Sequence, residues 1–277
     1  MLALEIKDVN QAFGPKKVLY NVNLEVNCGE FVSLVGPSGC GKSTLLRAIL
    51  GTHPPMYGEI TAGTEKVTKP NRNVGIVYQH YSLYEFMNAE KNVAFGLHQD
   101  QTSIPFRWFG YFFGWKEIKK RNIQKAKDML ISVGLEKAIQ LYPGEMSGGM
   151  RQRVAIAQAL IMQPKILLLD EPFGALDEAT REELQDMLVA LYKENKRAIV
   201  DGLPAPYTII IVTHELNEAI YLSDRVVGLS QYHKNGKEGA TIVYDEPSTA
   251  FDRNSERDYS LFIRQKEELR NIVFNPS

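Results

Sequence analysis

The sequence predicts an α/β fold that contains a phosphate-binding loop and an inserted helical segment. An apolar run at residues 31–35 leads through the glycine-rich residues 36–44 into a pattern of helical spacing at 45–50. A later apolar run at residues 208–213 predicts a further buried strand. Between them, residues 88–158 have the spacing and stop signals of helices. Strands that alternate with helices in this way indicate an open α/β sheet with a helical insertion.

The glycine-rich loop matches the pattern G-x-x-x-x-G-K-S/T in the strand–loop–helix context that a phosphate site requires. Glycines let successive backbone N–H groups surround a phosphate, and the positive end of the following helix faces the anion. Lys42 can reach the β- and γ-phosphates, and the Ser43 hydroxyl can coordinate Mg²⁺. The alternative is a glycine-rich turn that happens to contain a lysine. Because every fixed position is filled, we expect a nucleoside triphosphate site.

Composition narrows the class of protein. The 277 residues suffice for one large domain or two modest ones, and the formal net charge of -1 gives no basic field for nucleic acid. We interpret the basic residues 116–121 as a solvated helix face. The cysteines, Cys28 and Cys40, suit a reducing compartment. No apolar run approaches the about 20 residues that a membrane helix needs, so we expect a soluble, cytosolic chain.

The first third of the chain offers two candidate ligand contacts. Residues 4–9 and 18–26 alternate apolar and polar side chains, which predicts half-exposed strands. Phe13 lies between them and can stack on a base, although its spacing favours a core position. Gln79 follows the predicted strand 73–78, where it faces the ligand crevice or satisfies loop backbone groups.

The helical segment contains a second candidate anion site and an unusual aromatic stretch. Ser147–Gly149 precedes the amphipathic residues 154–162, so it offers a hydroxyl and free N–H groups, or simply an N-cap. Residues 104–115 contain both tryptophans. They bury their rings on the protein or form an exposed patch that meets a membrane protein or the bilayer interface.

Polar residues end two of the predicted buried strands. Asp170 and Glu171 follow the apolar residues 166–169. Beside a phosphate loop, Asp170 would hold Mg²⁺ through water and Glu171 would orient or deprotonate an attacking water. The alternative is a pair of solvated charges. His214 follows the strand 208–213, where an imidazole contacts a γ-phosphate or has a structural role.

The remaining elements are predicted more simply. Residues 182–192 form a helix, and residues 196–207, with a glycine and two prolines, form a loop. The last strands lie at 224–229 and 240–244. The polar tail that follows is partly helical near residues 267–270.

In this order, the motifs resemble the ATP-binding subunit of ABC transporters, in particular of the nitrate/sulfonate/taurine importer group. The resemblance covers nearly the whole chain, about residues 2–243. The matching motifs are Walker A at residues 36–44, the Q-loop at Gln79, the signature motif at 146–150, Walker B at 166–171, the D-loop at 175–177 and the switch histidine at His214. The signature departs from the usual Leu-Ser-Gly-Gly-Gln because Met146 and Met150 replace its first and last residues.

The resemblance implies a P-loop NTPase fold, with a RecA-like core, an antiparallel β subdomain and an inserted α-helical subdomain. The ATP-binding core would comprise residues 1–87 and 159–245. The helical subdomain with the signature motif would be 88–158, and residues 246–277 would be a C-terminal tail. Phe13 falls at the family's adenine-stacking aromatic, which reverses the preference for a core position.

The resemblance also implies the site. The expected cofactors are ATP and Mg²⁺, and each ATP would lie between two subunits, most simply a homodimer. Glu171, His214 and Gln79 would be catalytic, and Ser43, Gln79 and Asp170 would hold the metal. The residues expected to bind ATP are Phe13, Gly36, Pro37, Ser38, Gly39, Cys40, Gly41, Lys42, Ser43, Thr44, Ser147, Gly148, Gly149 and Asp177.

The implied function is ATP hydrolysis that powers a membrane importer of a small anion such as nitrate, a sulfonate or taurine. Partners would be transmembrane permease subunits and, indirectly, a solute-binding protein, with no nucleic acid. The subunit would lie peripherally on the cytoplasmic face of the bacterial inner membrane. The alternatives are an importer ATPase for a quaternary amine or another solute, and a soluble ABC ATPase without a transport role.

Overall fold

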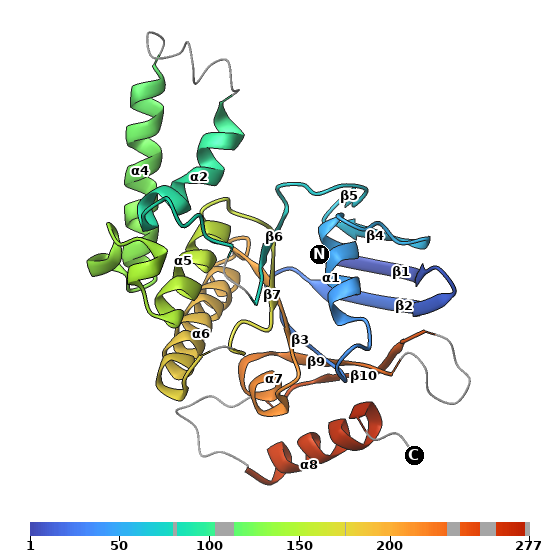
Figure 1. Cartoon of the computed structure of the whole chain (residues 1–277). Helices are drawn as coiled ribbons and strands as arrows, with labels where there is room; N and C mark the ends of the chain where they lie inside the picture. Colours follow the sequence, from blue (N-terminus) through green and yellow to red (C-terminus); the bar gives the residue numbers. More distant parts are fainter. Residues whose placement is uncertain (80–81, 103–113, 175, 232–238, 250–258, 275–277) are drawn as a thin grey trace. The chain divides into compact units, whose positions relative to one another are not determined.

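The computed structural model describes residues 1–79, 82–102, 114–174, 176–231, 239–249 and 259–274. The chain forms two compact units (Figure 1). Unit 1 comprises Met1–Ile76, Lys165–Pro172 and Leu188–Ser277, and unit 2 comprises Val77–Pro164 and Phe173–Met187. Unit 2 extends beyond the predicted 88–158 because side chains from outside that range, Leu83 and Met187, pack against its helical core.

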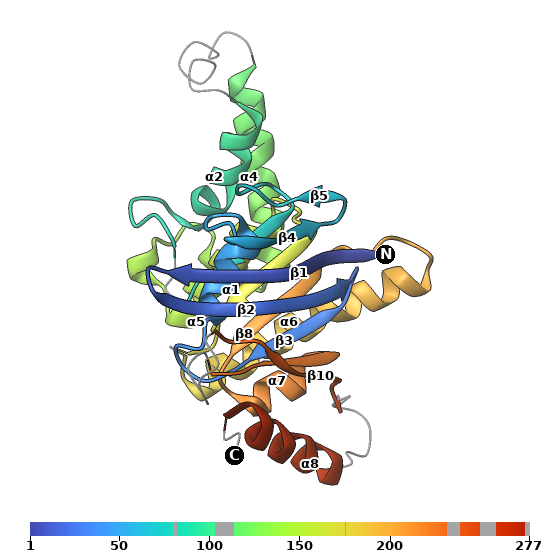
Figure 2. The ribbon, with the colours of Figure 1, turned by 90° about the vertical axis from the view of Figure 1, so that its right-hand side faces the viewer.

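The first sheet of unit 1 is antiparallel, with strand order β2-β1-β4-β5. Its strands are β1 (Leu2–Phe13), β2 (Lys16–Asn27), β4 (Tyr57–Ala62) and β5 (Glu65–Lys66). Figure 2 shows β1 and β2 side by side, as their pairing of Leu4 with Val26 requires. Both strands run beyond the predicted limits because register shifts between them absorb the irregular spacing.

The second sheet of unit 1 has the strand order β10-β9-β3-β8-β7-β6. Its strands are β3 (Phe31–Val35), β6 (Val74–Val77), β7 (Ile166–Asp170), β8 (Thr208–Thr213), β9 (Arg225–Leu229) and β10 (Ile242–Pro247). Strands β9, β3, β8 and β7 pair in parallel, and β3 and β8 are buried along their full length. Continuous apolar runs are typical of such covered parallel strands. Their carboxyl ends meet at one edge, where Val35 pairs with Thr213.

The main core of unit 1 lies around α1 (Lys42–Leu50), the helix that follows β3. Leu45, Leu46 and Ile49 of this helix are almost completely buried. They share one cluster with inward-facing side chains of both sheets. The start of α1 is therefore held by packing on two sides, which fixes the loop that precedes it.

Three further helices belong wholly or partly to unit 1: α6 (Glu178–Val200), α7 (Leu216–Leu222) and α8 (Tyr259–Leu269), which continues into η4 (Arg270–Phe274). The predicted loop at 196–207 is wrong for its first residues, because α6 continues to Val200. Buried Asn195 explains the difference: its amide side chain bonds the backbone N–H and C=O of Tyr207 and ties the helix to the following strand.

Unit 2 is helical, with α2 (Ala89–Gln101), α4 (Trp115–Ser132), η2 (Glu136–Ala138), η3 (Pro143–Glu145) and α5 (Gly148–Leu160). Its core includes Ala126, Leu130 and Val154. Most of the aromatic stretch, residues 104–113, lies outside the described residues. No helix among the described residues is both long enough and apolar enough to cross a membrane.

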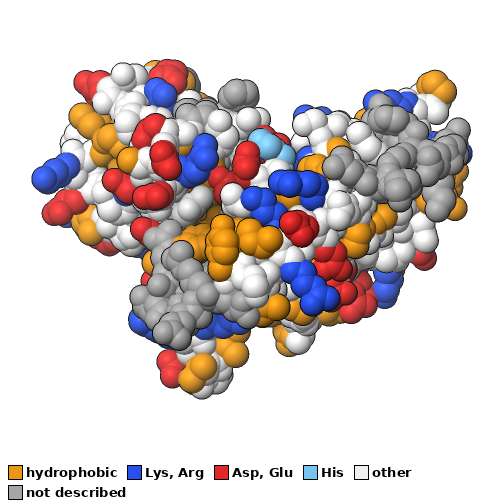
Figure 3. Space-filling view, turned by 90° about the horizontal axis from the view of Figure 1, so that it is seen from below, with side chains coloured by type: hydrophobic (Ala, Val, Ile, Leu, Met, Phe, Trp, Pro, Cys, Tyr) orange, Lys and Arg blue, Asp and Glu red, His pale blue; other side chains and the backbone are white. Residues whose placement is uncertain are grey.

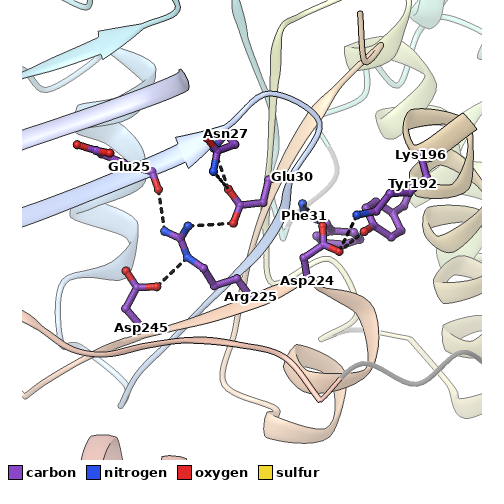
Figure 4. Close-up of polar contacts among 9 residues, drawn as sticks. All are labelled: Glu25, Asn27, Glu30, Phe31, Tyr192, Lys196, Asp224, Arg225 and Asp245. Carbon is purple, nitrogen blue, oxygen red and sulfur yellow. Dashed lines mark hydrogen bonds and ion pairs between the residues drawn. The ribbon is translucent and has the colours of Figure 1, made fainter. Parts of the chain in front are cut away.

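Charged residues connect the elements at the amino ends of β3 and β9 (Figure 4). The Arg225 guanidinium contacts the Glu30 carboxylate at 2.9 Å and the Asp245 carboxylate at 2.7 Å. Asp224 accepts hydrogen bonds from the Tyr192 hydroxyl and from the backbone N–H of Phe31. Burial and Asp224 together raise the pKa of the Tyr192 phenol, so this hydroxyl stays protonated. These contacts hold the end of the sheet opposite the phosphate-binding loop.

Candidate nucleotide-binding site

The loop between β3 and α1 has a backbone that requires glycine at two positions. Gly41 has a φ of 115°, and a Cβ there would lie 3.0 Å from side-chain atoms of Val18 and Leu19. At Gly36 a Cβ would lie 2.7 Å from the carbonyl oxygen of Leu229. Gly41 is also the N-cap of α1, and glycine has no side chain to bond the first helical N–H groups. The loop therefore presents free N–H donors and the positive helix end to an anion.

Lys42 lies inside this loop with only 6% of its surface exposed. Its Nζ donates to the carbonyl oxygens of Gly36 at 2.7 Å and Pro37 at 3.1 Å. These two neutral acceptors do not cancel the positive charge, so the site favours a bound anion. Cys40, also in the loop, is completely buried, and burial raises the pKa of its thiol, which leaves it a small packing residue.

A cavity of about 480 Å³ opens in front of the loop, a size within the range of small-molecule sites. Its lining residues are Phe13, Lys16, Val18, Ser38, Gly39, Gly41, Lys42, Ser43, Thr44 and Glu171. Phe13 has 48% of its surface exposed, so the core position favoured by its spacing is wrong. It ends β1 at the hairpin, and its exposed side chain lines the cavity, where a ring can stack on a base.

The carboxylates at the end of β7 suit a divalent cation. Burial, and then the charge of Glu171, raise the pKa of Asp170, against the opposing charges of Lys42 and Arg47. Two adjacent acidic groups at a partly buried strand end are stabilised by a bound cation. Because Mg²⁺ prefers carboxylate and hydroxyl oxygens, Asp170 and the cavity-lining Ser43 fit this metal.

Glu171 has a backbone conformation that is rare for a residue with a side chain. Its φ is 47°, in the left-handed region, and its N–H donates to the carbonyl oxygen of Val212 at 2.9 Å. The sheet therefore holds a conformation that costs energy, as is common at functional sites. The Glu171 carboxylate lies 3.4 Å from Nδ1 of His214, which follows the neighbouring strand β8. The structure thus brings the predicted base and the switch histidine together in unit 1.

In unit 2, Ser147 is the N-cap of α5 and accepts a hydrogen bond from the Met150 N–H at 3.2 Å. Gly148 begins the helix. A Cβ at Gly149 would lie 1.9 Å from Cγ2 of Thr180. Gly149 is therefore required for close packing between α5 and the start of α6, in addition to any ligand contact.

The Asp177 carboxylate accepts hydrogen bonds from the backbone N–H and the hydroxyl of Thr180, at 3.1 Å and 2.7 Å. These bonds lower the pKa of Asp177 and cap α6. Asp177 therefore fixes Thr180, which faces Gly149. Gln79 is exposed, just after β6.

A second cavity, of about 490 Å³, lies within unit 2 beside the signature motif. Its lining residues are Ile131, Gly134, Leu135, Glu136, Lys137, Ala138, Ser147, Gly149, Met150, Arg153, Thr180 and Glu183. The sequence prediction missed Lys16 of the first cavity and Thr180 of the second. The position of Lys16 across the hairpin from Phe13 was the available signal, whereas nothing in the sequence pattern marked Thr180.

The strand–loop–helix phosphate site, with carboxylates at the end of β7, defines a P-loop nucleotide-binding protein. The family model described as "ABC transporter" matches residues 19–174, more than half of the chain. The chain therefore belongs to the ABC transporter family.

Two curated relatives show what the chain is similar to. It is 38% identical to the bicarbonate transport ATP-binding protein CmpD of Synechocystis sp., over 88% of this chain and 80% of the relative. It is 40% identical to the sulfate/thiosulfate import ATP-binding protein CysA of Pseudomonas aeruginosa, over 90% of this chain and 70% of the relative.

Two solved structures share the fold. The ATP-binding cassette MJ0796, solved as a dimer in a post-hydrolysis state with ADP and Pi, aligns with a TM-score of 0.66 and 30% identity. The alignment covers 90% of this chain and all of MJ0796. The protein cbiO1 of Clostridium perfringens, part of the ABC transporter complex cbiONQ, aligns with a TM-score of 0.71. That alignment covers 97% of this chain and 94% of cbiO1, and at 23% identity it supports the fold alone.

Proposed function

We propose that the chain is the ATP-binding and ATP-hydrolysing subunit of an ABC importer. The observation that supports this most directly is the cavity lined by the phosphate loop, Phe13 and Glu171. It combines a stacking ring for adenine, a cradle of N–H donors for phosphates and a carboxylate next to the place where the γ-phosphate would lie.

In this proposal Lys42 moves from the loop carbonyls to the β- and γ-phosphates. Ser43 and Asp170 of unit 1 would hold Mg²⁺, which would neutralise the phosphate charge when bound. Glu171 orients and deprotonates the attacking water, and His214 contacts the γ-phosphate. The 3.4 Å separation of Glu171 and His214 supports a shared role at the reacting phosphate.

The site in unit 1 leaves the signature motif with a separate task. We assign Ser147, Gly148 and Gly149 to the ATP of a second, identical subunit, with Asp177 at the same interface. The start of α5 supports this assignment, because its N–H groups and positive dipole end suit a phosphate. The dimer of the MJ0796 cassette with ADP and Pi is consistent with it.

The relatives named above suggest the transport role. Because CmpD and CysA are bicarbonate and sulfate/thiosulfate transport subunits, we assign a small anion, such as nitrate, a sulfonate or taurine, as the solute. The partners would be transmembrane permease subunits and, through them, a solute-binding protein. The subunit would lie on the cytoplasmic face of the bacterial inner membrane.

The experiment that tests the phosphate site measures ATP hydrolysis with Mg²⁺ by the unchanged protein, Lys42→Ala and Lys66→Ala. Lys66 is exposed on β5, in unit 1 but outside the cavity lining, so it is the matched control. We expect Lys42→Ala to lower kcat/KM at least about 100-fold, because it removes charge stabilisation at the phosphates. Lys66→Ala should retain full activity. Equal hydrolysis by all three proteins would refute the proposed function.

A further inference from the structure

The C-terminal segment, residues 259–274, packs against the core of unit 1. In α8 and η4, Leu269 and Val273 are completely buried, and both belong to a cluster with Val35, Leu216 and Ile220. Figures 1 and 2 both show α8 next to α7. The residues predicted as a tail therefore pack behind the strand that leads into the phosphate loop and against the helix that follows His214.

Val273 packs on the sheet where the phosphate loop begins. Val35, the last residue of β3, pairs with Gly228 of β9. A Cβ at Gly228 would lie 2.4 Å from Cγ2 of Val273, so glycine is required for the valine to approach this closely. The carbonyl oxygen of Leu229, the next residue of β9, lies close to Gly36 of the loop. Val273 thus packs on the residue of β9 that pairs with the last residue of β3.

The amide side chain of Gln265 connects α8 to the end of β10, and its nitrogen and its oxygen each make two hydrogen bonds. Its Nε2 donates to the Tyr244 hydroxyl at 3.1 Å and to the Pro247 carbonyl oxygen at 2.9 Å. Its Oε1 accepts from the N–H and hydroxyl of Thr249, at 2.8 Å and 2.9 Å. Because only 5% of Gln265 is exposed, these bonds define one register for the helix.

The helix α7 connects this packing to His214. The Thr213 hydroxyl donates to the Glu218 carboxylate of α7 at 2.9 Å and accepts from the Glu215 N–H at 3.0 Å. In the sequence, His214 lies between Thr213 and Glu215, which these bonds hold in place. Leu216 and Ile220 of α7 belong to the same cluster as Leu269 and Val273. The Ser248 hydroxyl also donates to the Ile220 carbonyl oxygen at 2.6 Å. A shift of α7 would therefore move His214 relative to Glu171.

We propose that the C-terminal segment, residues 259–274, is a positioning element that holds α7, and through it His214, in the geometry that hydrolysis requires. Leu269 and Val273 are its positioning residues. The proposal rests on the proposed ATPase function and adds a role for side chains that do not line the nucleotide cavity. It predicts that the segment affects turnover more than ATP binding, because the cavity itself is formed by other elements.

The segment offers matched variants. Val273→Ala removes two methyl groups from the cluster, Leu269→Ala removes more, and Leu269→Met keeps the volume. Ile272→Ala is the control, since Ile272 is next to Val273 but 37% exposed. Figure 3 views the molecule from below Figure 1 and shows both hydrophobic and charged side chains on that surface. Each protein is measured well below its unfolding temperature.

The first measurement compares kcat and KM for ATP in the unchanged and His214→Ala backgrounds. We expect Val273→Ala and Leu269→Ala to lower kcat about tenfold with KM nearly unchanged, because misplaced catalytic groups lose rate. Leu269→Met and Ile272→Ala should turn over normally. In the His214→Ala background, Val273→Ala should cause no further loss. An equal loss in both backgrounds would show a purely structural role and overturn the proposal.

The second measurement does not depend on hydrolysis. The ring signals of His214 in a proton–carbon NMR spectrum, assigned by their loss in His214→Ala, should shift in Val273→Ala and stay in place in Ile272→Ala. An unmoved His214 signal in Val273→Ala overturns the positioning role, whatever the ATPase activity. A shifted signal in a protein that hydrolyses no ATP supports the positioning role and contradicts the proposed function alone.

Discussion

Asp170 and Glu171 are neighbours in sequence, yet the fold gives them different environments. Asp170 ends β7 inside the sheet, where burial and the charge of Glu171 raise its pKa. Glu171 turns out of the strand through its left-handed backbone and lines the cavity. The first carboxylate is therefore suited to a metal and the second to a water molecule.

The raised pKa of Asp170 predicts opposite effects of Asp170→Asn with and without ligand. A carboxyl group whose folded-state pKa is raised stabilises fully only below its unfolded pKa, and that stability is lost as pH rises through the folded pKa. Without nucleotide at pH 7, Asp170→Asn should therefore raise Tm by about 2 °C. The difference should disappear as pH falls below the ordinary range of the group.

With saturating Mg²⁺ and ATP, the unchanged protein should have a higher Tm than Asp170→Asn. Its Asp170 carboxylate binds the metal, and ligand binding raises Tm. Differential scanning fluorimetry at several pH values measures both effects. Asp201→Asn, at an exposed position, is the control. A lower Tm for Asp170→Asn in the absence of nucleotide would contradict this account of the site.

Gly149 provides a second prediction at the residue scale. Its missing Cβ is the space that Cγ2 of Thr180 occupies, so Gly149→Ala should lower the free energy of unfolding by about 2 kcal/mol. Thr180→Ser removes that methyl group, and the double variant should recover most of the loss. Gly144→Ala is the control, because a Cβ there meets no atom within 4 Å. Urea denaturation measures the four variants and the unchanged protein, and failure of Thr180→Ser to compensate would refute the packing role.

At the scale of elements, the sequence predicted what depends on local pattern. The strands β3, β7 and β8 were predictable because parallel strands covered on both faces are continuous apolar runs. The loop before α1 was predictable because its backbone conformation requires glycine at fixed positions. The end of α6 was not, because it depends on Asn195 bonding Tyr207, a contact that only the folded chain creates.

The same limit applies to the candidate site. Spacing alone favours a core position for Phe13, and the resemblance to the family reverses that preference. The exposed ring is explained by its place at the end of a hairpin strand, which escapes the alternation that buries its neighbours. The packing of Val273 behind Gly228 joins residues that are distant in sequence, and no local pattern indicates it. Motifs therefore predicted the residues that face the ligand, whereas the residues that support them required the fold.

Asn195 allows a test at this scale. Asn195→Ala would leave the partly buried N–H and C=O of Tyr207 without their partner, at a cost of about 2 kcal/mol in the free energy of unfolding. Lys193→Ala, at an exposed position of the same helix, should change stability very little. Urea denaturation compares the two, and equal stabilities would show that α6 does not need this contact.

At the scale of the whole molecule, each compact unit holds part of the predicted nucleotide site. Unit 1 contains the phosphate loop, Phe13, Glu171 and His214, and unit 2 contains the signature residues at the start of α5. Each part has features that suit phosphate. Two copies related by a two-fold axis would complete two equivalent sites, which is the closed symmetry common among homodimers.

Glu171→Gln tests this arrangement in the absence of partners. The substitution keeps the shape of the side chain but removes the proposed base, so ATP and Mg²⁺ should bind without being hydrolysed and hold two subunits together. Light scattering should then show the mass doubling when ATP is added to the variant, but not when ADP is added. Adding Ser147→Arg should abolish the doubling, because the bulky side chain would occupy the anion site at the start of α5. Adding Lys66→Ala, on the surface of unit 1, should leave the doubling intact. A variant that binds ATP and remains monomeric would show that the signature motif does not complete the site in the isolated subunit.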